Sequence, residues 1–149
     1  MNSVSSPVLL ARTYNAINLT SSSTASGRLM PQVEDIESKE LQSIDFYLKL
    51  SGLFCTYSLP VFDVFIHIGK GKAVLLSPLS FFGVQPRSSA NRVGSEIGIK
   101  IPPSLTHALT QSLLMCKAIH LSIEPQERQQ SDGHAIIETI RLFAVPRRS

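Results

Sequence analysis

Hydrophobic and polar residues alternate with a period of two through much of the middle of the chain. In residues 44–50, large apolar side chains fall on one face of an extended segment, and Asp, Tyr and Lys side chains fall on the other. This alternation is typical of a half-buried β-strand. The same criterion predicts further strands at residues 61–68, 73–76, 79–84, 97–101 and 119–123. Because only a Gly-containing break of four residues, 69–72, separates two of these strands, we expect them to form a β-hairpin.

One segment changes to helical spacing. Pro102 and Pro103 end the strand at 97–101, and proline is well suited to the first turn of a helix. Apolar residues then recur three and four positions apart, at Leu105, Ala108, Leu109, Leu113 and Cys116. This spacing predicts one main amphipathic helix over residues 104–117.

The two ends of the chain differ from its middle. Residues 1–33 form a polar segment rich in Ser, Thr and Asn, with one weak strand expected within residues 9–19 and a loop after it. Residues 34–145 hold the β-rich domain, in which residues 135–145 fit either a last strand or a short helix, and residues 146–149 are a basic tail. We therefore expect an α+β fold, a mostly antiparallel β-sandwich-like domain with the helix at 104–117 and minor helices.

Composition adds a strong asymmetry of charge to this outline. The chain has 149 residues, is 43% hydrophobic and carries a formal net charge of +3, which suits one domain and is too apolar for general disorder. Residues 34–45 contain five acidic side chains against Lys39 alone, a local charge of −4, so the remaining residues carry +7. The modest net charge therefore conceals a polarised molecule.

The cysteines and the hydropathy suggest a reducing compartment. Cys55 and Cys116 each lie in an apolar stretch and are too few for a disulfide scaffold, so we expect two reduced, buried thiols. No signal-peptide pattern occurs at the start, and no run approaches the ~20 apolar residues of a membrane span. We expect synthesis in the cytosol, and we expect any membrane binding to be peripheral.

The sequence holds no convincing catalytic constellation. The four histidines lack metal-binding spacing, and His67 and His120 fall inside predicted strands, where structural roles are expected. The 69–72 break has the wrong spacing for a phosphate loop and precedes a strand rather than a helix. The many serines leave a Ser-His-Asp triad as an alternative, although no G-x-S-x-G motif supports one. We assign no catalytic residue, metal or cofactor and expect a protein that is not an enzyme.

Basic residues between positions 67 and 100 are the most suggestive feature. The candidates for binding membrane or phosphate are Lys70, Lys72, Arg87, Arg92 and Lys100, against Glu96 alone. One interpretation is a solvated rim of loop cations. The other is a cationic surface for the phosphates of lipid headgroups or nucleic acid, to which each charge near an anionic membrane adds ~1 kcal/mol. The absence of an aromatic-rich RNA-recognition signature favours contacts with phosphates over base readout.

The order of these segments resembles a known family. Over residues 44–123 the chain is similar to the single-domain matrix proteins of non-segmented negative-strand RNA viruses, most closely the bornavirus and nyamivirus type. Residues 44–50 look like the mid-chain strand of that family, and residues 62–80 look like the hairpin that follows it. Residues 97–123 look like its strand-helix-strand unit. The similarity lies in pattern and order.

The resemblance implies a structural role in a virion. It implies a β-sandwich with helices that assembles with itself into a lattice beneath the viral envelope. The implied partners are further copies of the chain, anionic membrane lipids, the viral ribonucleoprotein or single-stranded RNA, and the glycoprotein tail. The implied locations are the inner face of the envelope, the host cytoplasm and the inner leaflet of cellular membranes, with the nucleus as a further compartment.

Other functions stay open on the sequence alone. The first is a nucleic-acid-binding accessory or nucleocapsid-associated protein, and the second is a rhabdovirus-type matrix protein with the same role on a different fold. A small hydrolase is a third, which would require His to cluster with Asp or Glu in a pocket.

The acidic block supplies a hypothesis for self-association, with the candidates Glu34, Asp35, Glu37 and Glu40. Opposite charges on this block and on the basic segment suit head-to-tail contacts between subunits. Changing all four acidic residues to Ser is expected to reduce the oligomer size measured by light scattering at low salt. An unchanged oligomer would contradict the hypothesis.

Overall fold

The fold is built almost entirely from antiparallel strands. The computed structural model describes residues 7–32, 44–57 and 59–146. Its first strands are β1 (Val8–Arg12), β2 (Ile17–Thr20), β3 (Ala25–Pro31), β4 (Ile44–Cys55) and β5 (Phe62–His67). They are followed by β6 (Val74–Leu79), β7 (Ser95–Lys100), β8 (Ile119–Pro125) and β9 (His134–Pro146), with helix α1 (Thr106–Leu114) between β7 and β8.

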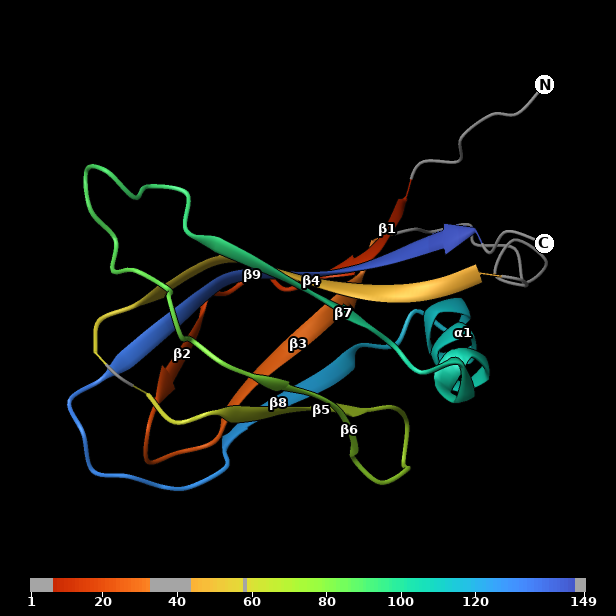
Figure 1. Cartoon of the computed structure of the whole chain (residues 1–149). Helices are drawn as coiled ribbons and strands as arrows, with labels where there is room; N and C mark the ends of the chain where they lie inside the picture. The colour runs from red at the N-terminus through yellow and green to blue at the C-terminus, as the bar shows by residue number, and fades with distance from the viewer. Residues whose placement is uncertain (1–6, 33–43, 58, 147–149) are drawn as a thin grey trace.

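The nine strands form one strongly curved sheet. Their order is β6-β5-β8-β3-β1-β9-β4-β7, and β2 pairs with β9 on the same side as β1. Strand β3 joins the two halves, because its first residues pair with β8 and its last residues pair with β1. The sheet is almost closed into a barrel, with edge strands β6 and β7 near each other. In Figure 1 the half containing β4, β7 and β9 crosses the half containing β3, β5 and β8.

Alternation along the strands places the core inside this curved sheet. Strand β4 buries Phe46, Leu48 and Leu50 while the residues between them face outward, as the period of two requires. Helix α1 lies at one end of the molecule (Figure 1), where Leu109 and Leu113 join the same core. The helix therefore covers one open end of the barrel.

The expected α+β class is wrong. The protein is mostly β, with 52% of the described residues in strands and 9% in helices. The helix expected at 104–117 is a short 3₁₀ turn, Pro103–Leu105, followed by α1, which ends at Leu114. Cys116 has a φ of 53°, a left-handed conformation that cannot continue an α-helix. No further helix occurs in the described ranges, so the expected minor helices are not found there.

Several strand boundaries also differ from the sequence expectations. The weak strand expected within residues 9–19 is two strands, β1 and β2, and the polar tract after it contains β3 rather than only a loop. The ambiguous segment 135–145 lies within β9. The strand expected at 79–84 does not form, because β6 ends at Leu79 and a long loop leads from there to β7.

This loop, residues 80–94, ends at a glycine that the packing requires. Gly94 has a φ of 79°, and a Cβ atom there would lie 3.0 Å from the Gly52 Cα and 2.9 Å from the Phe54 ring. Gly83, at the other end of the loop, has a similar φ of 81°, but a Cβ there would meet nothing within 4 Å. The two glycines therefore separate the effect of backbone conformation from the effect of close packing.

Alanine substitutions at these two positions should differ in cost. Gly83→Ala is expected to lower the free energy of unfolding by about 1 kcal/mol, because only the left-handed conformation is penalised. Gly94→Ala is expected to lower it by about 3 kcal/mol, because the new methyl group also collides with β4. Urea denaturation followed by circular dichroism measures both changes, and equal losses would contradict the packing argument.

Candidate binding surfaces

The five basic candidates do not form one patch. Lys70 and Lys72 lie on the exposed turn between β5 and β6, whereas Arg87 and Arg92 lie on the 80–94 loop. Figure 1 shows the turn at the same end of the molecule as α1 and the loop at the opposite end. The two groups are separated by the length of the β5–β6 hairpin, about 20 Å for six extended residues. Lys100 ends β7 and lies 4.0 Å from the Asp45 carboxylate.

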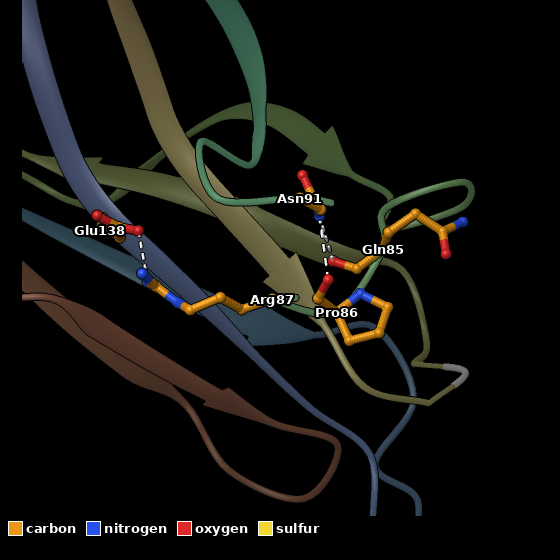
Figure 2. Close-up of polar contacts among 5 residues, drawn as sticks. All are labelled: Gln85, Pro86, Arg87, Asn91 and Glu138. Carbon is orange, nitrogen blue, oxygen red and sulfur yellow. Dashed lines mark hydrogen bonds and ion pairs between the residues drawn. The ribbon is translucent and has the colours of Figure 1, made fainter. Parts of the chain in front are cut away.

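Arg87 fixes the loop rather than offering a free charge. Its guanidinium donates a hydrogen bond of 2.5 Å to the Glu138 carboxylate on β9 and stacks 4.2 Å above the Phe54 ring on β4. Figure 2 shows this pair, together with Asn91 donating to the backbone carbonyls of Gln85 and Pro86. The loop is thus pinned to both long strands by its own side chains.

The pinned loop exposes large apolar side chains. Phe81 is buried edge-to-face against Phe62, but its neighbour Phe82 is 98% exposed. Val93 is 79% exposed at the far end of the loop, and Tyr57, 68% exposed, lines a hollow of about 430 Å³ together with Phe82. Large apolar groups held out in water are typical of an interaction surface.

One free cation accompanies these side chains. Arg92 is exposed and makes no hydrogen bond or ion pair with any residue that the structure describes. We call Tyr57, Phe82, Arg92 and Val93 the loop surface. It combines apolar bulk with positive charge, the combination that membrane interfaces and other anionic surfaces attract.

A second surface runs across the outer face of strands β1, β9, β4 and β7. The register places Arg12 opposite Arg141, and Arg141 opposite Lys49, so three cations form one row. Two residues further along β9 and β4, Phe143 lies opposite Tyr47 and gives a parallel aromatic row. We call these two rows the sheet groove.

The sheet groove is hollow and only partly neutralised. A cavity of about 700 Å³ is lined by the aromatic row, Lys49, Val145 and Gly98, whose missing side chain leaves the floor open. Lys49 is paired with Glu96 at 3.3 Å, whereas Arg141 has no ion-pair partner among the described residues. Like charges directly opposite on neighbouring strands destabilise a sheet, so this arrangement favours an anionic ligand.

Sequence reasoning named Arg92 but missed the other residues of both surfaces, for identifiable reasons. Gly83 is a signal for a turn, but the strand expected at 79–84 placed it and Phe82 in the sheet. The row of Arg12, Lys49 and Arg141 joins residues from three distant parts of the chain, and only the register of the strands brings them together.

The two cysteines have different environments, which corrects the expectation of two buried thiols. Cys55 is buried and its thiol donates a hydrogen bond of 2.9 Å to the Tyr57 carbonyl. Burial raises the pKa of Cys55, so this thiol is a poor nucleophile. Cys116 is free and exposed just after α1.

Within the described ranges, no three His, Cys, Asp or Glu side chains lie close enough to hold a metal ion, and no helix has the length and hydrophobicity needed to cross a membrane. The self-association candidates Glu34, Asp35, Glu37 and Glu40 lie outside the described residues. No protein-family model and no curated protein matches the chain.

Proposed function

We propose that this chain is a non-enzymatic, self-associating protein that coats anionic membrane surfaces, the role of a viral matrix protein. The observation that carries the proposal is Phe82, held almost fully exposed on a pinned loop that also carries the exposed Arg92. The similarity of segment order to single-domain matrix proteins supports the same role. In this role the protein would act beneath the viral envelope and at the inner leaflet of host membranes.

The energetics of the loop surface fit reversible binding that depends on assembly. Transfer of one Phe side chain to an apolar environment contributes about 1.5–3 kcal/mol, and one cation near an anionic leaflet contributes about 1 kcal/mol. These contributions are small for a single subunit. Self-association would present many loop surfaces to the same membrane, and the combined binding would then be strong without any new contact.

Vesicle binding tests the loop surface directly. Phe82→Ser is expected to weaken binding to phosphatidylserine vesicles about tenfold, because the inserted ring is lost. Arg92→Gln is expected to weaken it about fivefold at low salt and to have little effect at high salt. Sedimentation with vesicles measures both changes.

The matched control lies at the opposite end of the molecule. Met115, just after α1, is also an exposed apolar residue, at 59%, and Met115→Ser should leave vesicle binding unchanged. Circular dichroism shows whether each variant remains folded. If Phe82→Ser and Met115→Ser have the same effect, the loop surface does not bind the membrane.

The sheet groove favours a second candidate function, binding of single-stranded nucleic acid. Aromatic rings on a sheet stack with bases, and a neighbouring row of cations follows the phosphates. Phe143 and Tyr47 supply the rings, and Arg12, Arg141 and Lys49 supply the charges. A matrix protein that links a membrane to a ribonucleoprotein would use both surfaces.

The salt dependence of RNA affinity tests whether the sheet groove binds nucleic acid. Arg141→Gln is expected to reduce the slope of log affinity for single-stranded RNA against log salt by about 0.7, because one phosphate contact is lost. Phe143→Ala is expected to weaken binding about tenfold through lost stacking. Lys72→Gln, the same charge change on the β5–β6 turn, is the control. Fluorescence anisotropy measures binding, and an equal effect of Lys72→Gln would exclude the sheet groove.

A further inference from the structure

A second row of basic side chains lies on the other half of the sheet, outside both surfaces described above. The register places Arg28 on β3 opposite His120 on β8, and His120 opposite His67 on β5. Figure 1 shows these three strands side by side, in the half of the sheet opposite the one that contains β9. We call Arg28, His120 and His67 the histidine row.

Among the residues that the structure describes, no counter-charge lies next to the histidine row. Arg28 and His120 are exposed and make no hydrogen bond or ion pair with any described residue. The acidic residues on the same strands, Glu124 and Asp63, lie four positions away, about 13 Å in an extended chain. Asp63 also accepts a hydrogen bond of 2.8 Å from Gln126. Protonated histidines would therefore extend the charge of Arg28 along the row without compensation.

The other charged groups that the structure describes at this end of the strands are also basic. Lys70 follows His67 on the β5–β6 turn, and Lys117 precedes β8 after the helix. Strand β6, the remaining neighbour of β5, carries no ionisable side chain. The positive potential of the row is therefore reinforced by its neighbours rather than cancelled.

A hollow adjoins the exposed end of the row. Its volume is about 470 Å³, and Arg28 and His120 line it together with polar groups from Tyr14, Asn15 and Ser26. The Tyr14 hydroxyl accepts a hydrogen bond of 2.6 Å from the Gln32 side chain, which leaves its own proton available to donate. Hydroxyl, amide and guanidinium donors around one hollow match the acceptor oxygens of a phosphate group.

His67 has a fixed orientation at the other end of the row. Its Nε2 shares a hydrogen bond of 2.9 Å with the Ser122 hydroxyl. In a protonated ring both nitrogens donate. Nε2 would then donate to Ser122, and the Nδ1 proton would be left for a ligand or a bridging water.

We propose that the histidine row is a binding site for a phosphomonoester, and that its affinity rises as the histidines gain protons. The Arg28 guanidinium supplies two parallel donors for phosphate oxygens, and the imidazolium rings supply charge and further donors. A phosphomonoester dianion, with three terminal oxygens, matches this set better than a phosphodiester, which carries one charge. The same chemistry occurs in a phosphorylated lipid headgroup and in a free phosphorylated metabolite.

Two probes and two pH values test the proposal. Soluble inositol trisphosphate represents the free ligand, and vesicles containing phosphatidylinositol 4-phosphate represent the headgroup. Histidine gains a proton mainly between pH 8 and pH 5, whereas a phosphomonoester loses its second charge only near pH 6, so about pH 8 and about pH 6.5 are compared. Calorimetry is expected to show about fivefold tighter trisphosphate binding at the lower pH.

Variants assign this effect to the row. At the lower pH, Arg28→Gln is expected to weaken binding about fivefold, and His120→Gln is expected to remove most of the pH dependence. His107→Gln is the matched control, because His107 is an exposed histidine on α1 outside the row. Binding that does not change with pH, or an equal response of the control, would overturn the proposal.

The two probes distinguish a free phosphorylated ligand from a lipid headgroup. They also distinguish binding at the histidine row from binding at the loop surface. Binding to the trisphosphate alone identifies a free ligand, and binding to both probes that Arg28→Gln weakens identifies a headgroup as well. Binding to neither overturns the site. Because Phe82→Ser should leave trisphosphate binding unchanged, failure of the loop surface and failure of the histidine row are distinguishable.

Discussion

The pairing of β4 with β9 is the contact on which the rest of the structure depends. These are the two longest strands, of 12 and 13 residues, and they pair from Ile44 opposite Pro146 to Cys55 opposite Ala135. The other edge of β9 binds β1 and β2, so this one strand holds the N-terminal strands and the centre of the sheet together. A shift of the pairing by one residue would turn Arg141 and Phe143 from the outer face into the core.

The same pairing also positions both proposed contact surfaces. The sheet groove exists only because its rows cross β4 and β9 in this register, and the 80–94 loop is pinned to Glu138 on β9 and to Phe54 on β4. The loop surface is therefore held by rigid strands although it consists of loop residues. A preorganised loop loses less conformational entropy on binding than a mobile one, which favours contacts as small as a single phenylalanine.

Local patterns in the sequence predicted the middle of the fold, and long-range pairing explains what they missed. The alternation at residues 44–50, 97–101 and 119–123 corresponds to β4, β7 and β8 because each of these strands has one buried face. Segment 135–145 was ambiguous because Glu138 and Thr139 are both partly exposed. The buried Ile137 and Ile140 are then three positions apart, which imitates a helix. Strand β3 buries only Leu29 completely, so its pairing with β8 leaves almost no periodic signal.

The binding surfaces were harder to predict than the strands, because they depend on register rather than on composition. Lysines and arginines close in sequence, such as Lys72 and Arg87, lie at opposite ends of the molecule, whereas Arg12 and Arg141 lie side by side. In the row of Arg12, Arg141 and Lys49, like charges face each other across neighbouring strands, and this costs stability in the free protein. An anion that binds across such a row relieves the repulsion and also gains its own ion pairs. Relief of this repulsion is the physical reason for which we propose an anionic partner at the row.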